Sequence, residues 1–332
     1  MRLVNKKRHI IRNLIRVLII AFFVIVALDN IIIHTTVTEV CINDLPGSFD
    51  GYRIVQVSDL HNNVYGIGQS YLISCIKAAD PDIIVITGDL IDRNTKNVDN
   101  AMMFVSKAVE IAPVFYVSGN HEANLPEEYA ELVRRMDEAG VSILDNENVS
   151  VLTVEEESVT LAGITDPAFD WSKPDPVIVD EEIKTAFADV SDDQVKILLS
   201  HRPELINVYS KNSIDLVLTG HAHGGQVRLP FIGPLYSPSQ GLLPKYTSGL
   251  YIEGNTQMYV SRGIGNGIAP FRFNDGPELA VIVLRNNEPE ADDDCSSGFS
   301  IDKNRIPAFG IEFKTARFEN GYSALRVAVL CV

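Results

Sequence analysis

Short apolar runs that read as buried strands recur along the chain, and each leads into side chains that can bind a metal ion. The runs cover residues 52–58, 82–87, 114–118, 195–200 and 215–219. The polar clusters at their ends are Asp59-Leu60-His61, Gly88-Asp89, Gly119-Asn120-His121-Glu122, Ser200-His201 and Gly220-His221-Ala222-His223. Near-continuous apolar strands indicate a sheet that is covered on both faces. In such folds ligands bind beyond the carboxyl ends of the strands, so strands far apart in sequence can deliver donors to one place.

Helical segments are predicted between these runs, at residues 71–79 and 98–111, and a closing strand is predicted at residues 278–284. Strands that alternate with helices indicate the α/β class. A chain of 332 residues could hold one large domain or two smaller ones.

The distribution of charge argues against nucleic acid as a partner. The first 16 residues carry six basic residues and no acidic one, whereas the whole chain has a formal net charge of −16, which leaves −22 on the remainder. Such a body repels a polyanionic backbone, because binding to that backbone rests on Lys and Arg. The charge is compatible with recruitment of cations, and with small phosphorylated substrates whose charge is met locally by metal.

An apolar segment follows the basic residues at the N-terminus. Residues 17–28 are uninterrupted apolar residues, fewer than the roughly 20 that a membrane span prefers. Counted through Ile33, the segment would reach about 26 Å as a helix, which nearly crosses a hydrocarbon core if Arg16 extends to the interface. No Ala-x-Ala cleavage site follows, which favours an uncleaved membrane anchor over a cleaved signal peptide. A helix in a soluble core fits less well than either.

The position of the basic residues predicts the orientation of the chain. They precede the apolar segment, so the positive-inside rule keeps the N-terminus in the cytoplasm and exports everything after residue 34. We therefore expect a single-pass protein of the cell membrane with an exported body. Cleavage of the segment would instead give a secreted protein.

The histidines are concentrated in the polar clusters. Only His9 and His34 of the seven lie outside them. Asp59, Asp89 or Asp92 taken alone would also suit a helix cap, where Asp is favoured. The ordered set of clusters taken together indicates a functional site rather than a purely structural role. Carboxylate, imidazole and amide donors without a thiolate favour Mn²⁺, Fe²⁺/Fe³⁺ or Zn²⁺, ahead of Mg²⁺. One aspartate can bridge two ions, and two ions about 3.5–4 Å apart can clamp a phosphoryl group during displacement.

The ordered clusters resemble the motifs of the calcineurin-like metallophosphoesterase superfamily, whose pattern runs D-x-H, G-D-x-x-D, G-N-H-[DE], a lone H and G-H-x-H. The matching positions are Asp59-x-His61, Gly88-Asp89-x-x-Asp92, Gly119-Asn120-His121-Glu122, His201 and Gly220-His221-Ala222-His223. The resemblance covers about residues 45–285. Residues 224–227 and the loops after them look closest to the membrane-associated bacterial phosphodiesterase branch. The resemblance implies a four-layer α/β/β/α sandwich, here with an N-terminal transmembrane helix.

The resemblance also implies roles for individual residues. The first metal ion would be bound by Asp59, His61, Asp89 and His223. The second would be bound by Asp89, Asn120, His201 and His221, so that Asp89 forms the bridge. His121 would protonate the leaving oxygen or stabilise its charge, and Asp92 would orient His121. Arg93 corresponds to an arginine that contacts phosphate in the protein-phosphatase branch, although Asn94 departs from the glycine expected after it. Glu122 is expected to be an N-terminal helix acid rather than a ligand.

The function implied by the resemblance is hydrolysis of a small or lipid-linked phosphodiester by a metal-bridging hydroxide, next to the membrane bilayer. A phosphomonoesterase or phosphoprotein phosphatase is the alternative. A membrane-tethered metal-binding scaffold without activity is a second alternative. The pair His121 and Asp92 argues against the scaffold, which would have no use for an aimed proton donor.

Three regions are expected along the chain. Residues 1–34 form the basic segment and anchor or signal peptide, residues 40–285 the metallophosphoesterase domain, and residues 286–332 an acidic linker and a tail of unassigned role. Residues 145–193 are expected to supply surface strands and loops, with a turn at Pro174-Asp175-Pro176, and residues 229–277 long loops near the site. Residues 263–267 are rich in glycine, but no helix follows before Pro270, so a nucleotide-binding loop is not predicted.

The four cysteines are far apart and form no C-x-x-C pair. They suggest neither a thiolate zinc site nor a disulfide scaffold. Cys75, in a predicted helix, is expected to be a small buried hydrophobic residue.

Overall fold

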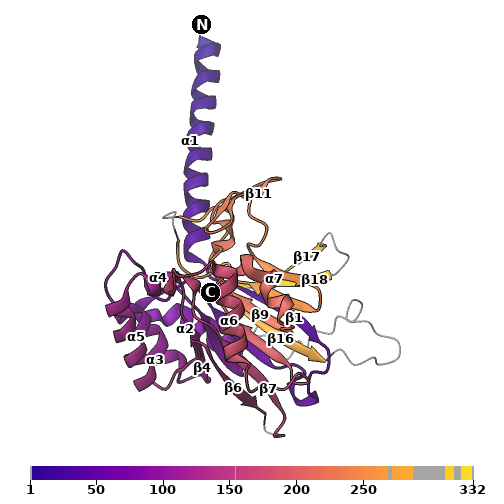
Figure 1. The fold of residues 1–332 in the computed structure, drawn as a ribbon. Helices are drawn as coiled ribbons and strands as arrows, with labels where there is room; N and C mark the ends of the chain where they lie inside the picture. The colour runs from indigo at the N-terminus through magenta and orange to yellow at the C-terminus, as the bar shows by residue number, and fades with distance from the viewer. Residues whose placement is uncertain (1, 154, 268–270, 287–310, 318–322, 331–332) are drawn as a thin grey trace.

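Two β-sheets form the centre of the body. A computed structural model describes residues 2–153, 155–267, 271–286, 311–317 and 323–330 (Figure 1). The first sheet has the strand order β17 (Ile311–Arg317), β18 (Ser323–Leu330), β1 (His34–Ile42), β16 (Glu278–Asn286), β2 (Arg53–Val57), β3 (Ile83–Thr87), β4 (Val114–Val117) and β5 (Ser142–Ile143). The second has the order β14 (Gly249–Glu253), β15 (Thr256–Val260), β9 (Leu216–Thr219), β8 (Lys196–Leu199), β7 (Ser158–Gly163) and β6 (Glu147–Leu152).

The strands that precede the polar clusters are parallel within each sheet. In the first sheet β2 pairs with β3 and β3 with β4, and in the second sheet β8 pairs with β9, all in parallel register. Parallel strands end at the same edge. A buried hydrogen bond connects this edge of the first sheet with that of the second. Gln56 Nε2 on β2 donates to the carbonyl oxygen of Thr219 on β9 at 2.9 Å. The predicted convergence of the strand ends is thereby confirmed.

Helices cover the outer faces of both sheets. Helices α2 (Ser70–Ala79), α3 (Asp99–Ala108) and α5 (Pro126–Glu138) bury apolar side chains against the first sheet. A second apolar cluster lies between the sheets, and a third packs α6 (Asp175–Ala186) and α7 (Ile206–Lys211) against the second sheet. In α5, Leu132 and Met136 face inward at helical spacing while the charged residues face solvent. The predicted α/β class is confirmed.

Residues 145–193 contain more regular structure than the sequence predicts. The strand β7 lies inside the second sheet and is almost entirely buried, and α6 packs over this sheet. The turn predicted at residues 174–176 is wrong, because these residues begin α6. Proline is tolerated in the first turn of a helix, where its missing N–H would have no partner in any case. Within the predicted loop region 229–277, β14 and β15 form an edge hairpin.

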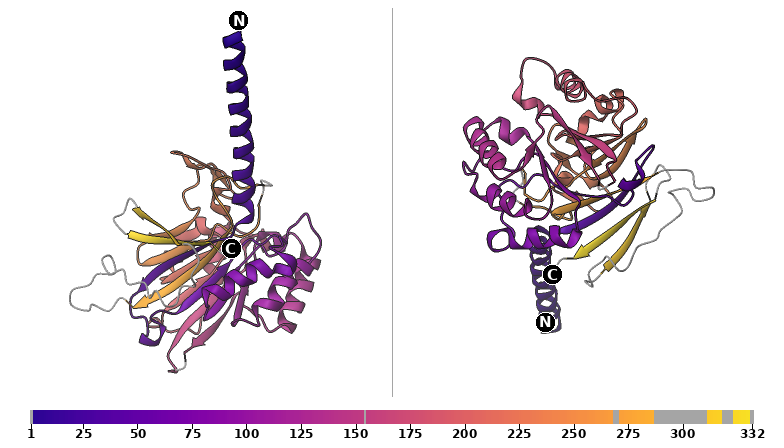
Figure 2. Two further views of the ribbon diagram at one scale, coloured as in Figure 1. Left: turned by 180° about the vertical axis from the view of Figure 1, so that it is seen from behind. Right: turned by 90° about the horizontal axis from the view of Figure 1, so that it is seen from below.

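Helix α1 (Arg2–Ile31) stands away from the body as one long helix (Figures 1 and 2). Its segment Ile11–Ile31 is 21 residues long with a mean hydropathy of 2.5, and none of it is buried within the described structure. Length and apolar character suit a membrane span or a signal sequence. The exposure of its side chains does not suit the helix of a soluble core.

The tail contributes to the first sheet, which the sequence does not predict. The strands β17 and β18 pair with each other, and β18 extends the sheet beside β1. The predicted acidic linker falls on residues 287–310, outside the described residues. Cys41 on β1 is disulfide-bonded, which the wide spacing of the cysteines in the sequence does not predict. Cys75 on α2 is a buried thiol, as expected.

Candidate metal centre

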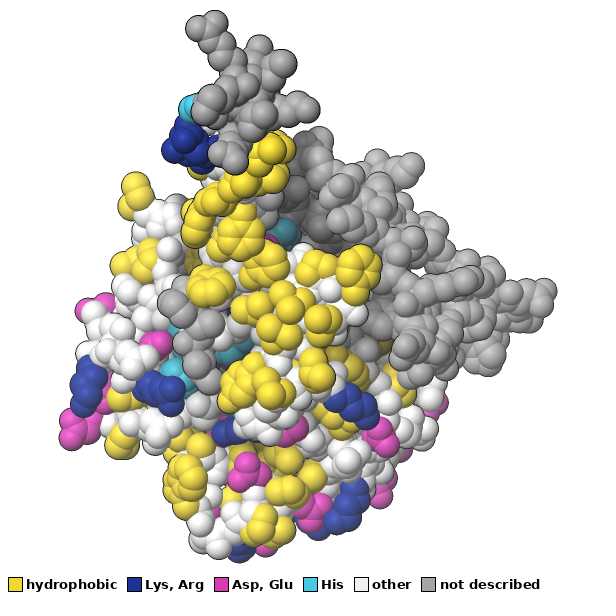
Figure 3. Space-filling model, turned by 90° about the horizontal axis from the view of Figure 1, so that it is seen from above, with side chains coloured by type: hydrophobic (Ala, Val, Ile, Leu, Met, Phe, Trp, Pro, Cys, Tyr) yellow, Lys and Arg dark blue, Asp and Glu magenta, His cyan; other side chains and the backbone are white. Residues whose placement is uncertain are grey.

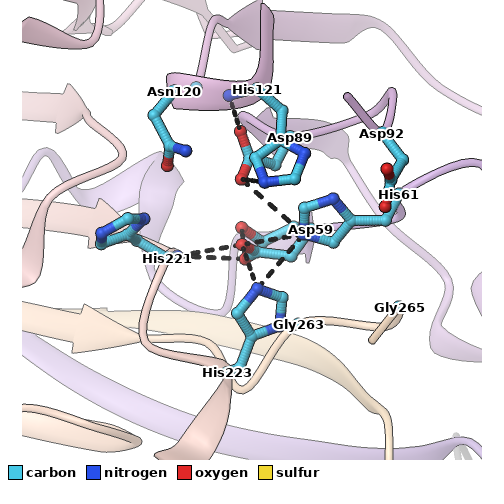
Figure 4. Close-up of polar contacts among 12 residues, drawn as sticks. Asp59, His61, Asp89, Asp92, Asn120, His121, His221, His223, Gly263 and Gly265 are labelled. Carbon is cyan, nitrogen blue, oxygen red and sulfur yellow. Dashed lines mark hydrogen bonds and ion pairs between the residues drawn. The ribbon is translucent and has the colours of Figure 1, made fainter. Parts of the chain in front are cut away.

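The side chains that follow the strand ends turn toward one point (Figure 4). Their backbone is unusual, because five of them adopt positive φ angles. These residues are Asp59 (53°), His61 (48°), Asp89 (53°), His221 (65°) and His223 (49°). Such conformations cost energy in residues other than glycine and persist where surrounding contacts fix them, often at functional sites. The sequence clusters therefore form tight turns whose side chains point back across the sheet edge.

The first group of donors consists of Asp59, His61 and His223. Their ligand atoms lie within 4.8 Å of one another, and all three residues are buried. His223 Nε2 lies 3.4 Å from Asp59 Oδ1 and 3.2 Å from His61 Nε2. The backbone N–H of His221 and the hydroxyl of Ser58 donate to the Asp59 carboxylate, which fixes its orientation.

The second group consists of Asp89, His201 and His221, again with ligand atoms within 4.8 Å of one another. His201 Nε2 lies 3.3 Å from Asp89 Oδ2 and 3.2 Å from His221 Nδ1. The same Asp89 Oδ2 lies 3.7 Å from His61 Nε2 in the first group. One carboxylate oxygen thus stands between the two groups, as a bridging ligand would.

Asn120 adds a further oxygen to this centre. Its Oδ1 atom is buried and accepts no hydrogen bond from the described residues. Figure 4 shows the amide pointing toward the space between Asp89 and His221. Buried polar atoms are nearly always paired, so an unpaired amide oxygen among carboxylate and imidazole donors fits a metal ligand.

Hydrogen bonds outside the two groups select the ring nitrogens that face the centre. His201 Nδ1 donates to the carbonyl oxygen of Thr87 at 2.8 Å, which leaves Nε2 free to bind metal. His221 Nε2 lies 3.0 Å from Ser239 Oγ, which leaves Nδ1 toward His201. Such outer contacts orient metal-binding histidines and fix their tautomers.

Burial and neighbouring charges determine which groups carry protons. Burial lowers the pKa of His61 to about 4, and it also lowers the pKa values of His221 and His223. The neighbouring Arg202 acts in the same direction on His221, and the neighbouring His61 and Arg272 act in the same direction on His223. Neutral imidazole is the form that binds metal. Burial would raise the pKa of Asp89, but His201, whose own pKa the Asp89 carboxylate raises to about 10 against the effect of burial, holds the pKa of Asp89 well below its usual range.

His121 lies beside the centre, with a defined proton position. Its Nδ1 accepts the backbone N–H of Arg93 at 3.2 Å, so the ring proton is on Nε2. This Nε2 lies 4.0 Å from Asp89 Oδ2. Asp92 lies near His61 and His121, within 4.8 Å, but its Oδ1 accepts the backbone N–H of Asn94. The orienting role of Asp92 stays a prediction. Arg93 is exposed, and its binding of phosphate also stays a prediction.

Glu122 is a structural carboxylate rather than a donor to the centre. Its two oxygens accept the backbone N–H groups of Asp89 (2.9 Å), Ile91 (3.2 Å) and Gly119 (2.9 Å). Burial, followed by the charge of Asp89, raises the pKa of Glu122 to about 8. The expectation that it acts at the start of a helix agrees with its place in α4 (Asn120–Ala123). At Gly119 a Cβ atom would lie 2.3 Å from Asp89 Oδ1, so only glycine permits this close approach.

Three neighbours of the centre were missed at the level of sequence. Arg202 forms a buried ion pair with Asp166 and donates to Ser239 Oγ at 2.6 Å, next to His221. Arg272 is fully buried and donates to the carbonyl oxygen of Gly263. Arg202 can be found from the sequence, because it directly follows His201. Ser239 and Arg272 belong to long loops, and no local pattern marks them.

Comparison with known proteins adds family information. Residues 52–225 match the family model described as calcineurin-like phosphoesterase. The chain is 30% identical over 265 residues to the metallophosphoesterase YkuE of Bacillus subtilis, covering 78% of this chain and 87% of that protein. It is 28% identical over 239 residues to the phosphodiesterase YaeI of Escherichia coli, covering 70% and 82%. A transmembrane protein with metallophosphoesterase domain from Danio rerio is 29% identical over 258 residues, covering 74% of this chain and 56% of that protein.

Proposed function

Because the chain belongs to the calcineurin-like phosphoesterase family and is therefore a hydrolase of phosphoric esters, we propose that it cleaves a small or lipid-linked phosphodiester. The observation that carries the proposal is the position of Asp89 Oδ2 between two groups of buried donors, 3.3 Å from His201 and 3.7 Å from His61. The relative YaeI is named a phosphodiesterase, which supports a diester rather than a monoester.

Divalent metal ions are the cofactors, and we propose two per chain. Asp59, His61 and His223 would bind one ion, Asn120, His201 and His221 the other, and Asp89 both. When bound, such a pair would supply an activated water molecule and neutralise charge on the phosphoryl oxygens. The donors include no thiolate, which favours Mn²⁺, Fe²⁺/Fe³⁺ or Zn²⁺.

The protein's own contribution to bond cleavage centres on His121. Its Nε2 carries the proton and lies on the side of the donor groups, 4.0 Å from Asp89 Oδ2. A proton at this position can pass to the leaving oxygen of the ester as the bond to phosphorus breaks. Arg93 is exposed close by and would contact the substrate phosphate.

The exposed apolar helix α1 and the transmembrane relative both indicate association with a membrane. We propose that α1 is an uncleaved single-pass anchor with its N-terminus in the cytoplasm and the body exported. The basic residues before the span support this orientation. A disulfide at Cys41 supports it as well, because disulfides persist in oxidising compartments.

The test of the proposed function is hydrolysis of matched aryl phosphodiester and phosphomonoester substrates by the full chain in detergent. We expect metal-dependent activity that is greater on the diester. Asp89→Asn should reduce the rate by about 10³-fold or more, since it removes charge from a ligand shared by both ions. The matched control is Asp137→Asn on the surface of α5, which should leave the rate unchanged.

Two results would contradict the proposal. Comparable rates for Asp89→Asn and the unmodified chain would exclude the bridging role. A clear preference for the monoester would transfer the assignment to a phosphomonoesterase or phosphoprotein phosphatase.

A further inference from the structure

The end of α1 is joined to the loop that borders the metal centre. Asn30 Nδ2 donates to the carbonyl oxygen of Arg272 at 2.8 Å, and Arg272 N donates to Asn30 Oδ1 at 2.7 Å. The backbone N–H of Asp275 donates to Asp29 Oδ2 at 3.1 Å. The guanidinium of Arg272 continues inward, with Nη2 3.5 Å from His223 Nδ1. The anchor and the metal centre therefore belong to one network of contacts.

A second contact between α1 and the body lies closer to the N-terminus of the helix. The rings of Phe22 and Phe273 are 5.6 Å apart between centroids. Phe22 precedes Ile31 by nine residues, which is about 13 Å along the axis at roughly 1.5 Å per residue. Phe22 thus lies well inside the apolar span Ile11–Ile31. A bilayer that contains this span would also contain Phe273.

The loops next to Phe273 carry exposed apolar side chains. Phe273 pairs with the strand end at Val227, and the hairpin of β10 (Arg228–Leu229) and β11 (Gly233–Pro234) rises from there beside α1 (Figures 1 and 2). The hairpin of β12 (Tyr236–Ser237) and β13 (Gly241–Leu242) follows. We define the apolar rim as the exposed side chains of Phe231 (109%), Ile232 (60%), Leu242 (80%), Leu243 (66%) and Phe271 (47%).

The apolar rim faces the same way as the membrane helix and lies over the metal centre. Seen along α1, the face from which the helix rises has apolar side chains around its base, with histidine side chains visible next to them (Figure 3). The second hairpin also reaches the centre directly, since Ser239 Oγ lies 3.0 Å from His221 Nε2. Leu242 and Leu243 on the same hairpin remain exposed.

We propose that the apolar rim inserts into the outer leaflet of the membrane that α1 crosses, so that the metal centre opens at the level of the lipid headgroups. The depth of Phe273 relative to the span requires the neighbouring loops to enter the bilayer. Residues 229–244 contain no Asp, Glu, Lys or Arg, as insertion requires. At their end stand Lys245 and Tyr246, a cation and an aromatic ring of the kind enriched at membrane interfaces.

Insertion of the apolar rim also indicates the class of substrate. This step rests on the proposed function. A phosphoester on a membrane lipid could reach the metal centre while its acyl chains stay in the leaflet. A water-soluble ester would gain nothing from the rim. The chemistry of the rim thus favours an amphiphilic phosphoester that the bilayer itself presents.

Insertion can be measured without reference to activity. Trp171 is the single tryptophan, so Trp171→Phe gives a silent background. In that background, Ile232→Trp places a reporter on the rim. Ile252→Trp is the matched control, because Ile252 is also exposed but lies on β14 beside the edge turn, at the end of the second sheet opposite the metal centre. The full chain is reconstituted into phosphatidylcholine vesicles whose acyl chains are brominated close to the headgroup.

We expect bromine to quench the tryptophan at position 232 at least about threefold more strongly than that at position 252, with emission shifted to shorter wavelength. Weak and equal quenching at both positions would overturn the proposal, because the rim would then lie in water. A blue shift at position 232 without quenching would also overturn it, since a second copy or another protein would then cover the rim.

Activity supplies a second, independent readout. A variant that combines Phe231→Ser, Ile232→Ser, Leu242→Ser and Leu243→Ser should keep kcat/KM within about twofold on a soluble aryl phosphodiester. It should lose at least tenfold on the same group attached to a dialkyl lipid in vesicles. Equal activity of this variant and the unmodified chain on the lipid substrate would contradict the role of the rim. If the unmodified chain hydrolyses neither substrate, the proposed function fails, while the fluorescence result still decides insertion.

Discussion

At the scale of single residues, the proton on His121 distinguishes this side chain from the other four histidines of the centre. The backbone N–H of Arg93 occupies Nδ1, so the proton resides on Nε2. In His201 the roles of the two ring nitrogens are reversed. Its Nδ1 donates to a backbone carbonyl oxygen, so in the neutral ring its Nε2 carries no proton and could bind metal. This arrangement supports the proposal that His121 gives a proton rather than binding an ion.

His121→Ala should retain the full metal content and lose most of the activity on substrates with poor leaving groups. A general acid contributes about 10²–10⁴-fold, and the loss should shrink for a nitrophenolate, which leaves without a proton. Elemental analysis and a series of leaving groups would measure both effects. If the variant loses metal, His121 is a ligand and the assignment is wrong.

The residues of the centre differ in how far the sequence predicts them. The donors follow buried strands in a fixed order, so apolar runs and short motifs suffice to find Asp59, Asp89 and His221. Ser239 and Arg272 contact the centre only because long loops fold back over it. Such contacts depend on the tertiary path of the chain, which local patterns do not encode.

At the scale of secondary-structure elements, Glu122 joins the start of α4 to the turn after β3. Its carboxylate accepts backbone N–H groups from both segments. The relative position of Asp89 and Asn120, which come from these two segments, therefore depends on a residue outside the two donor groups.

Glu122→Ala should lower the free energy of unfolding by at least about 2 kcal/mol, because it leaves three buried N–H groups without their acceptor. Thermal unfolding of the full chain in detergent would measure the change. The control Glu138→Ala removes an exposed ion pair to Arg134 on α5 and should cost less than about 1 kcal/mol. Equal effects of the two substitutions would show that Glu122 does not hold the segments together.

Element prediction succeeds where burial gives a clear pattern. The strand β3 is buried at every position, and its apolar run predicts it within one residue. The helix α6 was missed because Pro174 and Pro176 suggest a turn, although proline is also common at helix starts. The sequence does not predict where the tail strands lie, because β18 pairs with β1, almost 300 residues away in sequence, and β17 joins the sheet only through β18.

At the scale of the whole molecule, α1 and the body are joined by specific contacts rather than by a free linker. Asn30 near the end of α1 is bonded to Arg272, and Phe22 packs on Phe273. Only two residues separate α1 from β1, which enters the centre of the first sheet. The metal centre therefore has a defined position relative to α1.

The proposed topology rests on the positive charge that precedes the apolar segment of α1. A protease added to cells whose outer surface is accessible should digest the body and leave an N-terminal tag intact. Digestion of both after permeabilisation is the control for protease access. Protection of the body in intact cells would contradict the exported assignment and place the metal centre on the cytoplasmic side.

The proposed hydrolysis depends on two metal ions that share Asp89 as a ligand. Anomalous X-ray scattering from crystals of the full chain, after reconstitution with Mn²⁺ or Zn²⁺, would measure this directly. We predict two metal peaks per chain, about 3.5–4 Å apart, with Asp89 in contact with both. A single peak, or two peaks that share no protein ligand, would contradict the dinuclear centre.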